Sequence, residues 1–391
     1  MTEIVESVGD SAQFKKGWIN LLLKIFHTAD LHIGMKFNSY PDDIRGCLME
    51  ARFDVLDKMV QMANERLCNL FVVAGDLFNN INIPKRDIYR VIKSLEGFDG
   101  ECVLIMPGNH DYDNGMIDLW DTFKKNMSDK ILYLDEEKPF SLEQYGLDVM
   151  VYPAPCHSRH SDVNNIGWIK DNEEFVSQLC HIGIAHGSLE GISPDIDKNY
   201  YFMSKKELED TPVDIWLLGH THVSYPDNDT VNDWRIFNPG VPEPDGLDCG
   251  HEGYAWVITV DSDKLIKAEK VATGIYRFYD EQFQINDDDE FYKIRDTVLK
   301  DNPDKKVIRL TLKGRVSGDT FNDRLKLYDE LHDKTAYTII DDSGLGIKVT
   351  EEIIDKEFTS GSFPHRFLNE LADDDEALQI AYELIRGVEG C

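Results

Sequence analysis

The chain has few cysteines, and none are paired at the short spacing of a metal or redox motif. Its 391 residues include seven cysteines, an odd number, at positions 47, 68, 102, 156, 180, 249 and 391. The odd count and the absence of CxxC spacing are not typical of a disulfide framework. We therefore expect a reduced compartment and a cytoplasmic protein.

The chain also lacks an N-terminal apolar run long enough for a membrane helix. The stretch 19–26 is much shorter than the about 20 residues that span a bilayer. It leads straight into the polar letters DLH, so it is interpreted as a strand rather than as the core of a signal sequence. We expect no membrane partner, and we treat residues 1–23 as an N-terminal extension outside the fold.

Positive charge is scarce in this sequence. The 41 lysines and arginines are outnumbered by 73 acidic residues, and the formal net charge is −32. Proteins that hold duplex DNA through their own field are normally basic, because neutralising phosphates supplies much of the affinity. A chain-wide basic clamp is therefore excluded, and DNA binding would depend on metals, on a local basic surface or on a partner. The basic residues near the motifs described next are Lys36, Lys85, Arg86 and Arg159.

The chain does contain an ordered set of polar motifs, each placed where an apolar run ends. They are Asp30 and His32 in DLH, Asp76 in AGD, Asn109 and His110 in GNHD, His186 in AHGS, and His220 and His222 in GHTH. Each fragment alone is ordinary, since an Asp or Asn after a strand usually forms a turn or caps a helix. Together and in this order, they predict one shared site.

These residue types suit a two-metal site that acts on phosphate esters. Two cations about 3.5–4 Å apart can clamp an anionic ester and ionise a bound water. Such a pair needs a bridging carboxylate, and Asp76 is the natural bridge because it follows the apolar run Leu70–Ala74. We assign to the first metal Asp30, His32, Asp76 and His222. We assign to the second metal Asp76, Asn109, His186 and His220. Mixed Asp, Asn and His ligands without thiolate favour Mn²⁺, with Fe²⁺ or Zn²⁺ as alternatives, over an all-oxygen Mg²⁺ or Ca²⁺ site.

His110 is the motif histidine that this assignment leaves without a metal. It would stabilise the phosphate or protonate the leaving oxygen, as a positioned acid does. The alternative is that His110 only packs the loop. We predict that it is a catalytic residue.

The motifs, taken in order, resemble those of calcineurin-like metallophosphoesterases and, among these, of SbcD-type DNA repair exonucleases. The segments that carry the resemblance are FHTADLHIG, VVAGDLF, MPGNHD, IAHGS, LLGHTH and FNPGVPEPDG, and they cover roughly residues 24–276. The resemblance implies Mn²⁺-dependent cleavage of DNA phosphodiesters, often in complex with an SMC-like ATPase. The expected partners are thus DNA as substrate, an SMC-like ATPase subunit and, as a further option, a second copy of the chain.

One position departs from the family pattern. Family members often have His directly after GDLF, whereas this chain has Asn79. Asn can donate a hydrogen bond but cannot exchange a proton near neutral pH. The metal ligands are unaffected, but the departure puts in doubt how closely duplex cleavage follows the family. We predict that Asn79 lies near the substrate.

Apolar runs and helical periodicity predict an α/β fold with two sheets sandwiched by helices. Six runs predict strands: Leu21–Phe26, Leu70–Ala74, Val103–Met106, Val149–Tyr152, Ile182–Ala185 and Ile215–Leu218. Further strands are expected at Trp234–Asn238 and Tyr254–Val260. Helical spacing is shown by Leu48, Leu56, Met59, Val60, Ala63 and Leu67, which should pack on a sheet. We assign residues 24–275 to the metallophosphoesterase domain.

Residues 276–391 are predicted to form a smaller α+β capping domain, with a boundary near 275–289. This part holds 16 basic and 27 acidic residues, so it is not a basic clamp either. We expect a strand at Val307–Lys313, a helix at Thr320–Leu331, and two strands at Ala336–Ile340 and Ile347–Thr350 split by a turn in DDSGLG. The stretch Pro364–Val388 predicts one or two amphipathic helices, which pack on their own domain or dock a partner.

Three functions remain compatible with these patterns. The first is a two-metal, Mn²⁺-dependent DNA exonuclease or endonuclease of DNA repair. The second is a phosphodiesterase for nucleotides or other small esters, because the motifs recognise metal and phosphate but not the group attached. The third is a metal-bearing scaffold subunit of an SMC-like ATPase complex. The complete ligand set favours catalysis, since a scaffold has no need of it.

Overall fold

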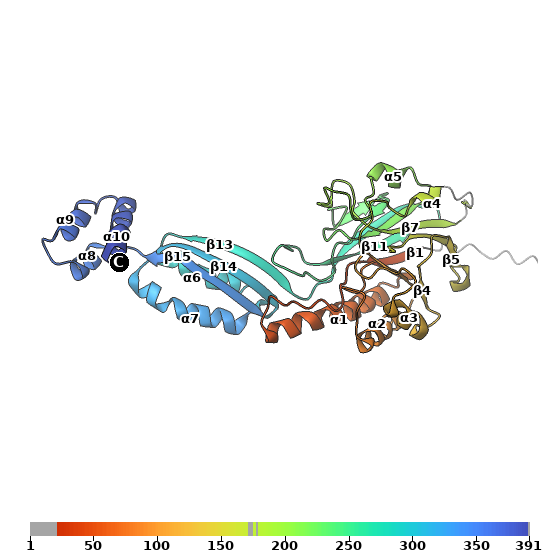
Figure 1. The fold of residues 1–391 in the computed structure, drawn as a ribbon, viewed down its shortest axis with the longest axis horizontal. Coiled ribbons are helices and arrows are strands. Elements are labelled where there is room, and N and C mark those ends of the chain that lie inside the picture. Colours follow the sequence, from red (N-terminus) through yellow and green to blue (C-terminus); the bar gives the residue numbers. More distant parts are fainter. Residues whose placement is uncertain (1–21, 171–174, 177–178, 390–391) are drawn as a thin grey trace, which may run out of the picture. The chain divides into compact units, whose positions relative to one another are not determined.

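The computed structural model describes residues 22–170, 175–176 and 179–389 (Figure 1). The chain forms two compact units. The first comprises the described residues of 1–36, 52–242 and 253–273, and the second comprises those of 37–51, 243–252 and 274–391. The strand expected near the N-terminus is β1 (Leu23–Thr28), so Leu23 of the predicted extension belongs to the fold, and residues 1–21 of that extension lie outside the described residues.

Two sheets form the centre of the first unit. The larger has the order β4 (Ile131–Tyr133), β3 (Cys102–Met106), β2 (Leu70–Ala74), β1, β11 (Tyr254–Val260), β12 (Ile266–Ala272) and β9 (Thr230–Asn232). The smaller has the order β10 (Ile236–Phe237), β8 (Ile215–Gly219), β7 (Cys180–His186), β6 (Val149–Ala154) and β5 (Phe140–Ser141). Strands β1 to β4 run parallel to one another, as do β6, β7, β8 and β10.

The apolar runs form strands that are buried on both faces, as parallel strands covered by other layers usually are. All five residues of β2 and of β3 are buried. One apolar cluster lies between the sheets and joins, for example, Val72 and Leu104 of the larger sheet to Ile184 and Leu217 of the smaller. The prediction of two packed sheets is confirmed.

Helices cover the outer faces of both sheets. On the larger sheet they are α2 (Lys85–Glu96), α3 (Asp118–Asn126) and the part of α1 (Asp42–Glu65) from Arg52 onward, whose apolar side chains share one cluster with the sheet. On the smaller sheet they are α4 (Gly167–Lys170) and α5 (Lys205–Glu209), with a 3₁₀ turn at Glu143–Tyr145 near its edge. These layers hold the strand ends in place from both sides.

Two details of this unit differ from the sequence prediction. Helix α1 ends at Glu65, and Leu67 itself adopts the left-handed conformation with a φ of 55°. Leu67 therefore lies beyond the helix and is 81% exposed, as residues that terminate helices in this conformation often are,. The strand expected at Trp234–Asn238 is only β10, and Trp234 is 39% exposed. Leu56, Met59 and Ala63 do pack in the cluster on the larger sheet, as their spacing predicts.

The second unit contains a three-stranded parallel sheet with helices α6 (Asp288–Val298) and α7 (Gly318–Lys334). Its strands are β13 (Arg277–Ile285), β14 (Lys306–Val316) and β15 (Tyr337–Ile347), with a short 3₁₀ turn at Pro303–Lys305. Strand β13 occupies the segment in which the sequence suggested only a boundary, because its alternation of buried and exposed residues is irregular.

The strand predicted at Ala336–Ile340 continues through DDSGLG as β15, whereas of the strand predicted at Ile347–Thr350 only Ile347 belongs to it. The pairing of β14 with β15 shifts between Thr311 and Lys313, whose partners are Asp341 and Gly344. The letters interpreted as a turn therefore form a bulge, in which glycine inside a strand is common. The eleven-residue β14 offers a continuous edge, so β15 continues to Ile347 past the bulge.

Three helices follow β15: α8 (Glu351–Glu357), α9 (Phe363–Glu370) and α10 (Asp375–Glu389). They enclose a small apolar cluster that includes Ile354, Leu368 and Leu378. The stretch Pro364–Val388, predicted to form one or two amphipathic helices, contains most of α9 and α10. Among the described residues, no helix is both long and apolar enough to cross a bilayer. The six cysteines of the described residues are free thiols.

Candidate metal centre

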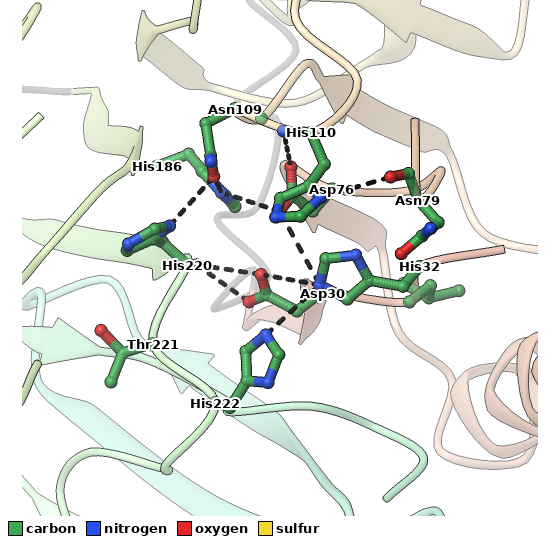
Figure 2. A network of polar contacts seen from close by, with 12 residues as sticks. Asp30, His32, Asp76, Asn79, Asn109, His110, His186, His220, Thr221 and His222 are labelled. Atoms are coloured by element: carbon green, nitrogen blue, oxygen red, sulfur yellow. Dashed lines mark hydrogen bonds and ion pairs between the residues drawn. The ribbon is translucent and has the colours of Figure 1, made fainter. Parts of the chain in front are cut away.

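The predicted ligands come together at the carboxyl ends of strands from both sheets of the first unit. Asp30, Asp76 and Asn109 follow β1, β2 and β3, which are parallel neighbours. His186 closes β7, and His220 follows β8. Parallel strands bring their carboxyl ends to one edge, where open α/β sheets usually build their sites. Figure 2 shows the side chains pointing toward one another.

The backbone of these loops adopts an uncommon conformation. Asp30, His32, Asp76 and His220 have φ values of 55°, 48°, 51° and 89°, in the left-handed region that few residues other than glycine occupy. Such residues cluster at functional sites because the surrounding structure must hold them there. Here Asp30 N–H donates to the Gly75 carbonyl at 3.1 Å and His32 N–H to the Asp76 carbonyl at 3.0 Å, so the first two loops hold each other.

Glycines in the motifs make room for His186. A Cβ added at Gly75 would lie 2.1 Å from His186 Nδ1, and one at Gly219 would lie 2.8 Å from the same atom. A Cβ at Gly108 would lie 2.2 Å from Asp76 Oδ1. The glycines of AGD, GNHD and GHTH are therefore required by the close packing of the side chains at the site.

One group of donor atoms gathers around His32 Nε2. His222 Nε2 lies 3.3 Å from this atom, Asp76 Oδ2 lies 3.7 Å away and Asp30 Oδ1 lies 3.9 Å away. Ligands bound to one cation by bonds of about 2.1 Å are separated by about 3–3.5 Å when they are neighbours. The donor set Asp30, His32, Asp76 and His222 is therefore close to the spacing that one ion needs.

A second group gathers around Asn109 Oδ1. His186 Nε2 and His220 Nδ1 each lie 3.0 Å from this oxygen. Asp76 Oδ2 lies 3.4 Å from His186 Nε2. The same Asp76 oxygen thus faces both groups, as a bridging carboxylate must.

The hydrogen bonds of His186 show that this group suits a cation. Its Nδ1 lies 2.8 Å from the Ala74 carbonyl oxygen, and a carbonyl only accepts, so Nδ1 carries a proton. In neutral His186 the Nε2 lone pair then points at the acceptor oxygens of Asn109 and Asp76. Three lone pairs that converge in this way repel one another unless a proton or a metal lies between them. The donor set therefore fits a metal, and the Ala74 contact fixes the ring as partners of metal-bound histidines commonly do.

The charges of the site depend on one another. Burial lowers the pKa of His186, but the adjacent Asp76 carboxylate outweighs it and raises the pKa to about 9. Burial raises the pKa of Asp30 to about 6. For Asp76, burial also raises the pKa, but the charge and hydrogen bond of His186, together with the charges of His32 and His110, outweigh burial, so the pKa of Asp76 lies below its usual value. Two fully buried carboxylates need compensating positive charge, which divalent ions would supply.

His110 lies beside the ligands, and its backbone N–H donates to Asp76 Oδ1 at 2.8 Å. Its Nδ1 lies 3.2 Å from the Asn79 carbonyl oxygen, so Nδ1 donates and Nε2 remains available to a substrate. The ring is half-buried, whereas those of His32 and His186 are buried. The donors of His110, His32 and Asp76 also lie within 4.8 Å of one another, so a role as ligand remains an alternative to a catalytic role.

Asn79 contributes its main chain to the site. Its carbonyl orients His110, and its N–H donates to the Ile33 carbonyl at 3.0 Å. The departure from the family pattern draws attention only to the side chain at this position. A main-chain role leaves no signal in the residue type, so it could not be predicted from the sequence.

Three supporting residues were not predicted, although all stand close to the motifs. Asp111 is fully buried and accepts from Gly108 N–H at 2.7 Å and from Phe78 N–H at 2.9 Å, which ties the second loop to the third. Burial raises the pKa of Asp111 to about 8. Asn238 donates to the carbonyls of Thr221 and Val223, at 2.7 Å each, and so holds the GHTH loop. The Arg159 carbonyl accepts from Asn109 Nδ2 at 3.4 Å, which turns Asn109 Oδ1 toward the histidines.

Comparison with known proteins agrees with this geometry. The model of the calcineurin-like phosphoesterase family matches residues 23–224, which include His110 and every proposed metal ligand. An uncharacterized metallophosphoesterase of Bacillus subtilis (strain 168), YhaO, is 27% identical over 207 residues, or 51% of this chain and 48% of that protein. The SbcD component of the nuclease SbcCD from the same organism is 29% identical over 92 residues, or 23% of this chain and 22% of that protein.

These matches therefore span less than half of the length of either relative. Among solved structures, TT1561 of Thermus thermophilus aligns with 64% of this chain and 99% of its own at 11% identity. Its TM-score is 0.37, which is too low to establish a common fold.

Proposed function

This chain belongs to the calcineurin-like phosphoesterase family, and on that basis we propose that it is a two-metal phosphodiesterase whose substrate is DNA. Family membership makes it a metal-dependent phosphoester hydrolase. The observation that carries the proposal further is the position of Asp76 Oδ2, which faces His32 Nε2 at 3.7 Å and His186 Nε2 at 3.4 Å. One carboxylate oxygen shared by two donor groups is what a two-metal phosphodiesterase requires.

The ligand sets follow the two donor groups. Asp30, His32, Asp76 and His222 hold the first ion. Asp76, Asn109, His186 and His220 hold the second ion. Bound there, the ion pair would clamp the phosphate and activate a water. Nitrogen and oxygen donors without thiolate favour Mn²⁺, with Fe²⁺ or Zn²⁺ as alternatives.

His110 supplies the proton chemistry in this proposal. Its Nδ1 is committed to the Asn79 carbonyl, so its Nε2 is free to stabilise the phosphate or protonate the leaving oxygen,. The Asp76 contact at the backbone N–H of His110 fixes the residue relative to the bridge. A shift of either loop would therefore move both the metals and the acid.

DNA is proposed as the substrate because one relative is part of a nuclease. The net charge of −32 opposes long-range attraction of DNA. Binding of DNA must therefore depend on local contacts with the metals and with the few basic residues beside them. A phosphodiesterase for nucleotides or other small esters is the second candidate, and the same charge favours it.

A direct comparison of substrates tests the proposal. Purified protein would be incubated with Mn²⁺ and end-labelled linear duplex, and in parallel with a small chromogenic phosphodiester. We expect release of nucleotides from the duplex that stops when the metal is chelated. Metal-dependent turnover of the small ester, without cleavage of the duplex or of an end-labelled single strand included in the same assay, would support the second candidate. No hydrolysis of either at full metal loading would contradict both and leave a scaffold role.

The second unit offers a surface for a protein partner. Helices α9 and α10 expose Phe363, Phe367, Ile380 and Leu384, at 74, 39, 54 and 66% of their surfaces. Because the relative named above is one component of a nuclease, we infer that these side chains dock an SMC-like ATPase. Phe363→Ser with Leu384→Ser should abolish co-elution with a purified ATPase of that class, while hydrolysis by the chain alone stays unchanged. Co-elution that survives both substitutions would contradict the assignment.

A further inference from the structure

A row of three aromatic rings begins at the proposed metal centre and ends at the surface of the first unit. The ring centroids of His220 and Tyr200 lie 5.2 Å apart with planes inclined by 30°, and those of Tyr200 and His160 lie 4.9 Å apart. His220 belongs to the second donor group, Tyr200 is half-buried and His160 is exposed. Such a row offers π-faces at increasing distance from the site.

The loops that carry this row are held firmly. Ser158 N–H donates to the Tyr201 hydroxyl at 3.0 Å, and that hydroxyl lies 2.9 Å from the Ser158 carbonyl. Ser161 N–H donates to the Asn199 carbonyl and Tyr201 N–H to the Ser161 carbonyl, at 2.9 Å each. Ser188 N–H, two residues after the ligand His186, donates to the Tyr200 carbonyl at 2.8 Å. Because the rings are positioned in advance, binding against them costs little ordering.

A positive charge lies on the same loop. Arg159 is exposed, and among the described residues no hydrogen bond or ion pair reaches its guanidinium. Its carbonyl contacts Asn109 Nδ2 at 3.4 Å, so the residue adjoins a proposed ligand. An uncommitted guanidinium beside a phosphate-binding site suits a second phosphate, which arginine binds through its fork of donors.

We propose that Arg159, His160 and Tyr200 form a binding ledge for the nucleotide next to the scissile phosphate. The nucleobase stacks on the exposed end of the ring row, at His160 and Tyr200, and Arg159 contacts the neighbouring phosphate. A base can reach this ledge only if it is unstacked from its neighbours, so the preferred substrate is a single strand or a frayed end. The inference rests on the proposed phosphodiesterase function and narrows its substrate to nucleotide chains.

The ledge should bind a strand that carries bases more tightly than a strand that lacks them. Stacking of a base on an aromatic side chain tolerates any sequence, because every base has a π-face. Contacts to phosphate alone would hold a base-free chain as well as a base-bearing one. The ledge therefore predicts a preference for bases over abasic sites, without a preference among bases.

Equilibrium binding tests the ledge without requiring turnover. Labelled tetrathymidylate with phosphorothioate linkages, which hydrolyse slowly, would be titrated with protein and Mn²⁺, alongside a tetramer that carries abasic sites. His160→Ala should raise the Kd for the base-bearing strand about fivefold or more, the scale of one lost stacking contact, and change the Kd for the abasic strand less than about twofold. His160→Phe, which retains a ring without a charge, should bind as the wild type does.

His157 provides a matched control within the same loop. It is also exposed, but its Nδ1 lies 2.8 Å from the Asp113 carbonyl oxygen and its Nε2 lies 3.7 Å from Glu137. His157→Ala should therefore leave both Kd values unchanged. Arg159→Gln should weaken both strands and reduce the slope of log Kd against log salt by about 0.7, the value for one phosphate of a single strand. Metal content and circular dichroism of each variant establish that the centre and the fold persist.

The outcomes separate the ledge from the proposed function. Equal Kd values for base-bearing and abasic strands, or equal losses in His157→Ala and His160→Ala, would overturn the ledge, even if the protein hydrolyses DNA with Mn²⁺. Base-dependent binding that is lost in His160→Ala but accompanied by no hydrolysis of unmodified DNA would support the ledge and overturn the proposed hydrolysis of DNA. Tight binding of duplex alone would also contradict the ledge, because paired bases cannot reach the rings.

Discussion

Polar residues follow parallel strands in both units, but they behave differently in each. In the second unit, Asp287 and Ser317 follow β13 and β14 and cap α6 and α7, where they accept from Glu290 N–H at 2.8 Å and Thr320 N–H at 3.2 Å. Their φ values are −151° and −60°, which any residue adopts. In the first unit, the corresponding residues Asp30 and Asp76 have left-handed φ values. Their carboxylates both lie near His32 Nε2, so they face a shared group of side chains.

The comparison shows what distinguishes a cap from a ligand. The side-chain oxygen of a helix cap accepts a hydrogen bond from a backbone N–H two or three residues later in the chain. Asp76 instead faces donors that arrive from loops after β1, β3 and β7, at separations of up to 110 residues, such as His186. The local sequence is similar in both cases, and only the convergence of several loops creates a site for ions.

Removal of the bridge should produce the largest effect. Asp76→Ala takes away the oxygen that both donor groups share, so at least one ion should be lost and turnover should fall by on the order of 10³-fold or more, since metal activation contributes several kcal/mol. Metal analysis of the purified variant, together with hydrolysis rates, would measure this. If Asp76→Ala retained two equivalents of Mn²⁺, Asp76 would be no more than an ordinary loop residue, as Asp287 is.

Replacement of His110 should leave metal binding intact and remove the group proposed to donate a proton to the leaving oxygen. His110→Gln is expected to retain two metals and lower turnover by about 10²–10⁴-fold, the usual contribution of a positioned acid or base. Metal content and kcat would be determined on the same preparation. Loss of metal together with activity would make His110 a ligand, the alternative that its closeness to His32 and Asp76 leaves open.

A cap substitution in the second unit should change stability and nothing at the centre. Ser317→Ala removes the acceptor for Thr320 N–H and should destabilise the unit by about 1 kcal/mol, seen as a lower midpoint of denaturant unfolding. Metal content and turnover should match the wild type. A change in metal affinity in this variant would remove the distinction between the two kinds of strand end.

Much of this distinction could be predicted from the sequence. Apolar runs locate β2, β3 and β8 to within one residue at each end, because strands buried on both faces are continuously apolar,. The run Ile182–Ala185 locates only the centre of β7, which extends from Cys180 to His186. The order of the motifs predicts that Asp30, Asp76 and His186 share one site. The sequence pattern could not predict the edge strand β13 or the bulge in β15, because both depend on how the strands pair. It could not predict the contact between Asn79 and His110 either, because the main-chain carbonyl that makes it is present in every residue.

The smallest expected effect is that of Asn79→His. The main-chain contact to His110 persists in this variant, and the new ring adds a group able to exchange protons near the substrate. We expect duplex cleavage to become faster by no more than about tenfold, with a smaller change on a small diester. Rates would be compared at matched metal loading. An equal or slower rate on duplex would show that the side chain of Asn79 does not limit catalysis.

The central claim is that two ions share Asp76, and metal stoichiometry with magnetic resonance tests it most directly. The purified protein, stripped of metal and titrated with Mn²⁺, should bind two equivalents per chain. Its electron paramagnetic resonance spectrum should show two spin-coupled ions, as a bridge of one carboxylate between ions about 3.5–4 Å apart requires. Binding of one equivalent, or of two equivalents that give only the signal of isolated Mn²⁺, would contradict the account.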